Sequence, residues 1–380
     1  MEVVYSIGVR FGGGGIGNVA LQAVRGIHRK GYLKRLIVGT DESGEFDKLL
    51  VKEVFLPRAV NKAMYLAGQN DVNRSLVTDS LFDRLACKHI EKCDIFHVWG
   101  NFGLRSLKKA KSLGAVTVIE RASSHPVTQN RLLDEEYRRF LNKSYITGSV
   151  QRVIDRAVAE MDECDYITVP SEFAADSLVE NGVDRKKLLL LPFGVDTTRF
   201  RPREKQDDTF RAVFIGQVSV RKGILYLLEA WKGLGLPGSE LLVVGPQSPD
   251  IKELLAKYAN TENIRFVNYV KDLTQVYQTA SVFVFPSIEE GSALVNYEAM
   301  ASGVPLITNY NSGSLARDGV DGFVIPVRDV AAIREKLKTL YEDPGLRDKM
   351  GKSARKRMEK YTWQAYGDNL VREYEKIARQ

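Results

Sequence analysis

The chain has 380 residues, of which 44% are hydrophobic and 27% charged; this composition is that of a globular protein, and the length exceeds one ordinary core, so we expect two domains. The net charge is +7, and residues 1–196 hold 28 basic and 25 acidic side chains, which leaves +3 on that half and +4 on the rest. The even spread excludes a basic nucleic-acid-binding tail and favours a solvated surface, while affinity for anionic substrates or an anionic membrane stays open.

The cysteines and the N-terminal segment indicate the cellular compartment in which we expect the protein. Cys87, Cys93 and Cys164 show no CxxC spacing, which argues against a disulfide framework or a zinc site and suits a reducing environment. Met1 leads directly into EVVYSIGV without a basic segment, and no apolar run is long enough to span a bilayer. We therefore expect a cytoplasmic protein, with contact at the cytoplasmic membrane face left open.

Short apolar runs alternate with longer helix-like segments along the chain. The runs are apolar throughout, as is typical of strands buried on both faces of a parallel sheet. Strands that alternate with helices form βαβ units, so the predicted fold class is α/β with parallel sheets. The expected strands are 3–9, 35–38, 94–98, 115–119, 166–169, 187–190, 211–215, 240–244, 264–267, 281–285 and 304–308.

A glycine-rich loop, FGGGGIGN, follows the first expected strand and precedes a helix. Gly12, Gly14 and Gly17 satisfy G-x-G-x-x-G, and Asp41 follows the second strand where a ribose-binding acid would lie. This pattern indicates an NAD-dependent oxidoreductase as one alternative. We favour the other interpretation, a flexible loop where a substrate approaches the backbone closely.

Two histidines follow or end strands in the first half of the chain. His97 lies in FHVWGN and His125 in VIERASSHPVTQ. A single histidine is usually structural, and we place His97 in that class. His125 directly follows a strand end and lies among small polar residues, so it is the better site candidate.

A domain boundary is expected over residues 191–208, which are rich in proline, glycine and charge. The next strand, RAVFIG, leads into QVSVRKG and then a helix. Arg221 and Lys222 lie just ahead of that helix, where cations suit a diphosphate. The alternative is a solvated pair of loop side chains.

Residues 285–303, FPSIEEGSALVNYEAMASG, carry two carboxylates with seven residues between them. Glu290 lies in the loop after a strand, and Glu298 lies in the following helix. Ligands of open α/β sheets bind beyond the carboxyl ends of strands, and helix N-termini favour anions. The segment therefore indicates a bound anion beside polyol hydroxyls. Glu289 is the rival of Glu290, and the adjacent Gly291 favours Glu290.

The C-terminal segment, residues 343–380, is predicted to form two helices that are broken near residues 361–363. Thr362 is a suitable N-cap for the second helix, because a threonine hydroxyl can accept a hydrogen bond from the first helical turn.

Taken together, these segments resemble the retaining GT-B glycosyltransferases of the large group 1 family. The stretch from Glu290 to Glu298, followed by AMASGVPLI, resembles the E-x7-E signature of that family. VSVRKGILYLLEAW resembles its phosphate loop, LLLLPFGVDTTRF its interdomain linker, and NSGSLARDGVDGFVIPVRD its late DG-x-x-G-F segment. RASSHPVTQNRLLDEE resembles a His-bearing loop of its first domain. The likeness covers most of the chain and is strongest over residues 191–329.

The resemblance implies a GT-B fold, in which two Rossmann-like, doubly wound parallel-sheet domains face each other across a cleft. The acceptor-side domain would comprise residues 1–192, and the nucleotide-sugar-binding domain residues 193–362. A helix over residues 363–380 would pack back on the first domain.

The resemblance also implies roles by position, with His125, Glu290 and Lys222 as the catalytic residues. Glu298 would bind the ribose and Glu290 the donor sugar, while Lys222 and Arg221 would hold the diphosphate together with backbone N–H groups of the following helix. His125 would lie beside the donor sugar. The donor-binding residues would be Gly14, Gly15, Gly216, Arg221, Lys222, Tyr269, Val270, Glu290, Gly291, Ser292, Ala293, Leu294, Val295 and Glu298.

The implied reaction is transfer of a hexose from a UDP- or GDP-sugar to a hydroxyl of a glycan, glycolipid or small molecule, with retention by a same-face mechanism. The nucleotide sugar is a substrate, and neither a cofactor nor a metal ion is expected. Gln217 stands where many relatives have arginine, and Ser292 and Ala293 stand where an aromatic residue is usual, so the sugar stays open. The alternatives are an NAD-dependent oxidoreductase that uses Gly12–Gly17 and a non-catalytic GT-B-like partner protein.

Overall fold

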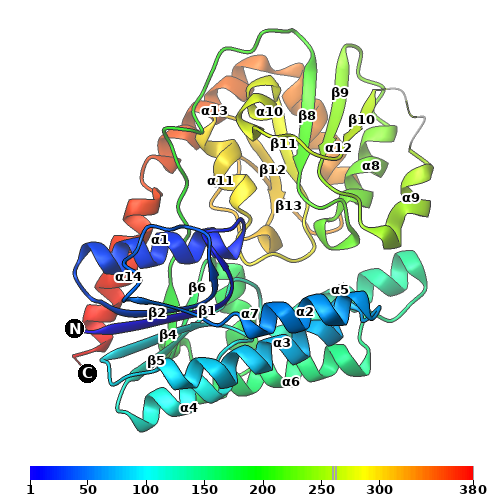
Figure 1. The fold of residues 1–380 in the computed structure, drawn as a ribbon. Coiled ribbons are helices and arrows are strands. Elements are labelled where there is room, and N and C mark those ends of the chain that lie inside the picture. Colours follow the sequence, from blue (N-terminus) through cyan, green and yellow to red (C-terminus); the bar gives the residue numbers. More distant parts are fainter. Residues whose placement is uncertain (259–260, 262, 380) are drawn as a thin grey trace.

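The computed structural model describes residues 1–258, 261 and 263–379, which fold into two parallel sheets with helices around them (Figure 1). In this part of the chain the first sheet has the order β3-β2-β1-β4-β5-β6-β7 and the second the order β10-β9-β8-β11-β12-β13. Both orders begin in the middle of the sheet and reverse direction there, which is the doubly wound topology. The predicted α/β class with two Rossmann-like sheets is confirmed.

The first sheet and its helices occupy the N-terminal half. Its central strands are largely apolar with little exposure, and β4 is buried at every position, as expected for strands covered by helices on both faces. The elements are β1 Val3–Phe11, α1 Ile16–Arg29, β2 Leu33–Asp41, β3 Val51–Glu53, α2 Leu56–Leu66, α3 Asp71–Ala86, η1 Cys87–His89, β4 Ile95–Trp99, α4 Leu104–Ser112, β5 Val116–Glu120, α5 Pro126–Leu141, α6 Gly148–Glu163, β6 Tyr166–Val169, α7 Glu172–Glu180, η2 Arg185–Lys187 and β7 Leu188–Leu190.

The second sheet follows the same plan, and several of its helices begin at side-chain caps, such as Asp329 before α12, which accepts from Ala332 N at 2.8 Å. None of the described helices is both long and apolar enough to cross a bilayer. The elements are β8 Phe210–Ile215, η3 Val220–Lys222, α8 Ile224–Lys232, β9 Ser239–Val244, η4 Pro249–Ile251, α9 Lys252–Ala256, β10 Ile264–Val267, α10 Leu273–Thr279, β11 Val282–Phe285, α11 Leu294–Ala301, β12 Leu306–Asn309, η5 Tyr310–Ser312, β13 Gly322–Ile325, α12 Val330–Glu342, α13 Pro344–Met358 and α14 Trp363–Ile377.

Two strands, β3 and β13, were not predicted from the sequence. Both lie at an outer edge of their sheet; no residue of β3 is fully buried, and only the two end residues of β13 are. An edge strand does not need the continuous apolar run that identifies a central parallel strand, so the pattern that found the other strands is absent.

The chain crosses between the two sheets twice, and the crossings lie side by side. Val195 forms a parallel bridge with Thr362, and its N–H donates to the Tyr361 carbonyl at 2.9 Å. The predicted break between the last two helices is confirmed, because Thr362 caps α14 by accepting from Ala365 N at 3.1 Å.

Helix α14 returns to the first sheet and packs against α1 (Figure 1). A buried polar cluster ties it there: the Tyr366 hydroxyl donates to the Glu120 carboxylate at 2.8 Å. The Tyr374 hydroxyl lies 2.6 Å from His97 Nδ1, and His97 Nε2 lies 3.1 Å from Glu120. His97 is therefore structural, as predicted.

The α1–α14 contact depends on two glycines. A Cβ built on Gly26 would lie 2.6 Å from Gly367 Cα, a distance that forces the helices apart. We therefore expect Gly26→Ala to lower the free energy of unfolding by about 1–3 kcal/mol, as overpacking does. Gly148→Ala is the matched control, since nothing lies within 4 Å of its Cβ. Urea midpoints compare the two variants, and equal midpoints would contradict the proposed steric contact.

Candidate active site

A cavity of about 290 Å³ lies between the two domains and is called the interdomain cavity below. Its second-domain wall begins where β8 and β11 end, at Ile215 and Phe285, so it lies at the carboxyl ends of parallel strands. The residues that line it are Gly15, Ile16, Val19, Ala122, Phe193, Ile215, Gly216, Gln217, Lys222, Phe285, Glu290, Ser292, Ala293, Leu294 and Val295.

Lys222 supplies the cation of this cavity. Its ammonium group contacts the Glu290 carboxylate and lies 5.7 Å from the centre of the Phe285 ring. The next residue, Gly223, has φ 66°, and a Cβ there would lie 2.0 Å from the Pro286 carbonyl oxygen, so the turn requires glycine. Burial and the neighbouring Arg221 lower the pKa of Lys222 to about 7. An incoming anion would favour its charged form.

The N-terminus of α11 faces the same cavity. Leu294 and Val295 begin this helix and line the cavity, and the N–H groups of a first turn have no intrahelical partner. The preceding residues are already engaged, since Ala293 N donates to the Ser312 carbonyl at 3.2 Å and Ser292 Oγ donates to the Gly313 carbonyl at 2.8 Å. The N–H group of Ala293 is therefore engaged within the protein, and the predicted N–H donors that face a ligand include those of the first helical turn.

Glu298 lines a separate cavity of about 190 Å³, called the α1–α11 cavity below. Leu294 lines both cavities, so they adjoin. The Tyr277 hydroxyl donates to Glu298 at 3.0 Å, and burial nevertheless raises the pKa of Glu298 to about 7. Over residues 1–258, 261 and 263–379, no group of three His, Cys, Asp or Glu side chains is placed to hold a metal ion.

Arg221 does not line the interdomain cavity and pairs mainly with Glu289, and its guanidinium also lies 3.9 Å from the Glu290 carboxylate. Its guanidinium lies 2.8 Å from the Glu289 carboxylate, and its Nε donates to the Glu289 carbonyl at 3.1 Å. Glu289 is fully buried and also accepts from Ser124 Oγ at 2.8 Å and Gln129 Nε2 at 3.1 Å, across the cleft. From the sequence, Glu289 was considered only as the rival of Glu290. The two adjacent acids that follow β11, Glu289 and Glu290, were the feature of the sequence that could have indicated two separate roles.

Besides Arg221, five predicted site residues line neither cavity, namely His125, Tyr269, Val270, Gly14 and Gly291. His125 caps α5, with its Nδ1 accepting from Val127 N at 3.2 Å. Burial, with Arg121 nearby, lowers the pKa of His125 to about 4, so the imidazole is neutral at pH 7. Tyr269 is 76% exposed in the loop after β10, and Val270 follows it.

The glycine-rich loop contributes Gly15 to the interdomain cavity, while Gly14 has open space where a Cβ would be. A Cβ on Gly17 would lie 2.1 Å from the Arg10 carbonyl oxygen, so packing alone requires glycine there. Asp41 accepts from Ser43 N at 2.8 Å and from Ser43 Oγ at 2.7 Å. Local packing thus accounts for Gly17, and local hydrogen bonds account for Asp41, without a bound dinucleotide.

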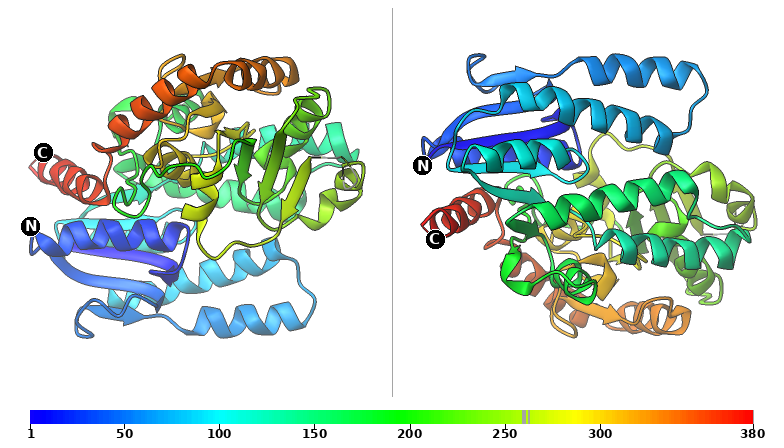
Figure 2. Two further views of the ribbon diagram at one scale, coloured as in Figure 1. Left: turned by 90° about the horizontal axis from the view of Figure 1, so that it is seen from above. Right: turned by 90° about the horizontal axis from the view of Figure 1, so that it is seen from below.

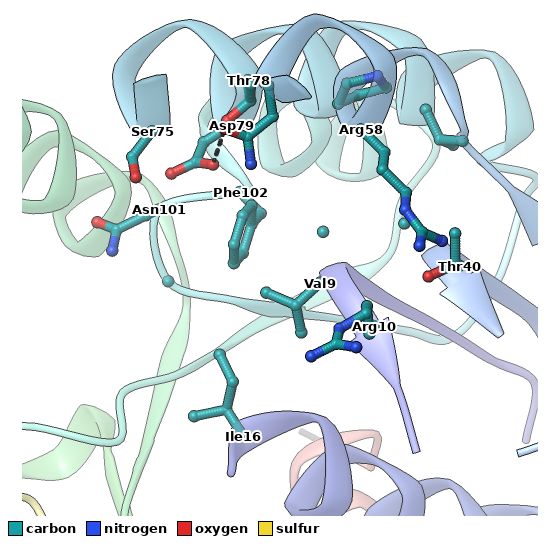
Figure 3. Close-up of a pocket in the computed structure, with 16 residues that line it drawn as sticks. Val9, Arg10, Ile16, Thr40, Arg58, Ser75, Thr78, Asp79, Asn101 and Phe102 are labelled. Carbon is teal, nitrogen blue, oxygen red and sulfur yellow. Dashed lines mark hydrogen bonds between the residues drawn. The ribbon is translucent and has the colours of Figure 1, made fainter. Parts of the chain in front are cut away.

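A third cavity, of about 630 Å³, opens in the first domain and is called the first-domain cavity (Figure 3). It lies beyond the carboxyl ends of β1, β2 and β4, and Arg10 and Arg58 extend toward it from β1 and α2. Burial raises the pKa of Asp79 on its wall to about 7. Ile16 lines both this cavity and the interdomain cavity, so the two adjoin.

Both halves of the chain match family models. Residues 13–199 match the model "Glycosyltransferase Family 4", and residues 195–357 match "Glycosyl transferases group 1". The MMP alpha-(1->4)-mannosyltransferase of Mycolicibacterium hassiacum is 29% identical over 272 residues, which are 67% of this chain and 64% of that protein. The matched regions span between 44% and 64% of the curated relatives compared.

Two solved structures show the same fold. Sucrose-phosphate synthase from Thermosynechococcus elongatus superposes with a TM-score of 0.75 and 19% identity over 99% of each chain. Anabaena HepE in complex with UDP superposes with a TM-score of 0.68 and 15% identity, over 99% of this chain and 100% of that one. With the GT-B fold matched along its length and both halves matched in order, the chain belongs to the group 1 glycosyltransferases.

Proposed function

We propose that the protein is a retaining glycosyltransferase that moves a hexose from a UDP- or GDP-sugar to an acceptor hydroxyl. The observation that carries this proposal is the order of groups along two adjoining cavities: Glu290, then Lys222 with the start of α11, then Glu298. A nucleotide sugar presents sugar, diphosphate and ribose in the same order. The Mycolicibacterium relative is named a mannosyltransferase, and HepE holds UDP, which supports this donor class.

In this proposal the two glutamates position the donor. Carboxylates accept hydrogen bonds from sugar hydroxyls, so Glu290 holds the hexose and Glu298 the ribose. Lys222 contacts Glu290, and the donor diphosphate binds beside the same ammonium group.

The bond between the anomeric carbon and the diphosphate oxygen breaks during transfer, and negative charge grows on the leaving phosphate. Lys222 and the first-turn N–H groups of α11 are fixed donors aimed at that charge, which is the preorganised stabilisation that lowers such barriers. We propose that they act without a divalent ion. The acceptor attacks the face that the phosphate leaves, and its proton passes to that phosphate.

The first-domain cavity is proposed as the acceptor side, because it adjoins the interdomain cavity at Ile16. Glycan, glycolipid and small-molecule acceptors all stay open. The role of His125 at the reaction centre and that of Tyr269 and Val270 at the base stay predictions, since none of these residues lines either cavity.

The two alternatives receive less support. The carboxylate of Asp41, the ribose ligand of an NAD-dependent oxidoreductase, is engaged by Ser43. A non-catalytic partner protein would have no need of Lys222, Glu290 and Glu298 arranged around adjoining cavities. A thermal-shift screen with UDP-glucose, GDP-mannose and NADH separates these possibilities, because stabilisation by NADH alone would favour the oxidoreductase.

Substitutions at two positions test the donor site. We expect Lys222→Ala to lower kcat about 10²- to 10³-fold, since it removes a fixed charge that stabilises the leaving group. Glu298→Ala should weaken donor binding by about 1.5–3 kcal/mol, as loss of hydrogen bonds to a charged group does. Donor hydrolysis and isothermal titration with the stabilising nucleotide sugar measure both. Lys232→Ala, on exposed α8 surface, is the control, and normal activity in both site variants would refute the assignment.

The pKa values of Lys222 and Glu298, each about 7, predict a bell-shaped pH dependence of donor affinity. The diphosphate needs Lys222 charged, so affinity falls above that pKa, whereas the ribose needs Glu298 ionised, so affinity falls below it. Along each limb, donor affinity changes by at most about tenfold per pH unit. Lys222→Arg should flatten the alkaline limb and Glu298→Gln the acid limb. Titration with a nucleotide sugar, whose diphosphate does not titrate near neutrality, checks this, and identical profiles in all three proteins would contradict it.

A further inference from the structure

The first-domain cavity lies between two helices and the ends of several strands. Helix α2 contributes Arg58 and Asn61 to its wall, and α3 contributes Ser75 and Asp79. Both views of Figure 2 place these two helices side by side, with α2 at the outer edge of the first domain. The opposite wall is formed by the ends of β1 and β2 and by the loop after β4. The volume of about 630 Å³ is in the range of sites for small molecules.

Two arginines from different elements form a basic end of this cavity. Arg10 from β1 and Arg58 from α2 lie toward one side of it in Figure 3. Within the described part of the chain, the Arg58 guanidinium has neither a hydrogen bond nor an ion pair. Arg10 lies 3.3 Å from Glu42, but these side chains are 66% and 38% exposed, and such surface pairs contribute little. Both guanidinium groups are thus available to an anion in the cavity.

The opposite end of the cavity carries groups that bind hydroxyls. Ser75, Asp79 and Asn101 lie there in Figure 3, and Val9 and Phe102 lie between them and the two arginines. The carboxylate of Asp79 and the amide of Asn101 accept hydrogen bonds, while the hydroxyl of Ser75 donates or accepts. The cavity therefore has a basic end and a hydroxyl-binding end, with an apolar stretch between them.

Asn101 offers an acceptor that the rest of the protein does not satisfy. Its Oδ1 is buried and has no hydrogen-bond partner among the described residues. The backbone at this position is fixed, because φ is 77° and the Asn101 N–H donates to the Glu160 carboxylate at 2.5 Å. Asparagine is one of the few side chains that tolerate this left-handed conformation. Since an unpaired buried acceptor is costly, a hydroxyl donated by a ligand suits the position.

The two ends together select one class of ligand. Cations at one end and hydroxyl acceptors at the other match a sugar or polyol that carries an anionic group. A phosphate monoester has three terminal oxygens and can accept from two guanidinium groups at once, whereas a carboxylate has only two oxygens. A phosphate therefore suits two arginines from separate elements better than a carboxylate does.

We propose that the acceptor is a sugar or polyol that bears a phosphate group. Arg10 and Arg58 bind the phosphate, while Asn101 and Asp79 accept hydrogen bonds from hydroxyls at the other end. Ile16 lines both this cavity and the interdomain cavity, and a further hydroxyl of the ligand meets the donor on that side. The identity of this ligand as the acceptor rests on the proposed function, whereas the binding of a phosphorylated sugar does not.

Isothermal titration of the full chain tests this class of ligand, with a saturating nucleoside diphosphate present to occupy the donor site. The probes are glucose, mannose and myo-inositol, each with and without a phosphate monoester, and glucuronate. We expect a phosphorylated probe to bind roughly tenfold or more tightly than its parent, since hydrogen bonds to charged groups are the stronger ones. Dihexanoyl phosphatidylinositol carries the phosphate on a lipid, and if it binds more tightly than the free phosphates, the phosphorylated acceptor is lipid-borne.

Two substitutions separate the ends of the cavity. Arg58→Ala should weaken the phosphorylated probe roughly tenfold or more and leave its parent unaffected, so that the preference for phosphate is lost. Asn101→Gly, which suits a left-handed backbone, should weaken both probes by a similar factor of about three to ten. Arg84→Ala is the matched control, because it removes an exposed arginine of α3 that lines none of the three cavities. Thermal midpoints show whether the variants are folded.

Three outcomes would overturn the proposal. No phosphorylated probe could bind more tightly than its parent, glucuronate could bind as tightly as glucose 6-phosphate, or Arg58→Ala could bind the phosphorylated probe as Arg84→Ala does. Donor binding and donor hydrolysis without acceptor report on the transfer reaction separately. Their failure beside intact phosphate binding would refute the proposed function alone, and the reverse result would leave a transferase whose acceptor is uncharged.

Discussion

The buried carboxylate of Glu289 connects the two walls of the cleft, and the geometry of the site depends on it. A buried charge is costly unless partners surround it. Here Arg221 comes from the second domain, while Ser124 and Gln129 come from the first. Burial alone would raise the pKa of Glu289, but Arg221 and Ser124 outweigh it and the pKa is lowered. Removal of one partner from such a buried pair typically lowers stability by about 3–5 kcal/mol. These contacts therefore strongly favour the arrangement in which the two walls of the cleft meet.

This arrangement explains why neighbouring residues serve different purposes. Because Glu289 engages Arg221, Lys222 is left as the cation that lines the interdomain cavity. Gly291, which follows Glu290, must also be glycine, since a Cβ there would lie 1.8 Å from the Ala122 carbonyl oxygen of the first domain. The glycine after Glu290 is thus a steric requirement of domain contact, in addition to being part of a family motif.

Much of the fold could be predicted from the sequence because central parallel strands appear in it as continuous apolar runs. The edge strands β3 and β13 could not, since they are short and only partly buried. The positions of Lys222 and Glu290 beside one cavity could be predicted because each lies in a segment that follows a strand, and Glu298 follows in α11. The roles of these residues stay predictions. The direction of Arg221 could not be predicted, because its partner Glu289 is held by groups 160 or more residues away. The distance of His125 from the cavity could likewise not be predicted from the sequence, because it depends on how the two domains meet.

The paired chain crossings at Val195 and Thr362 determine how the domains can move. Two connections joined at one place permit rotation about that place and oppose sliding. Gly194, Val195 and Trp363 line the α1–α11 cavity, so the proposed ribose site lies at the pivot, where displacement is smallest. The contacts of Glu289 with Ser124 and Gln129 lie outside that cavity, so a rotation about the crossing would displace them more. The nucleoside end of a ligand would therefore stay anchored while the sugar end opens to solvent, which orders the release of the two products.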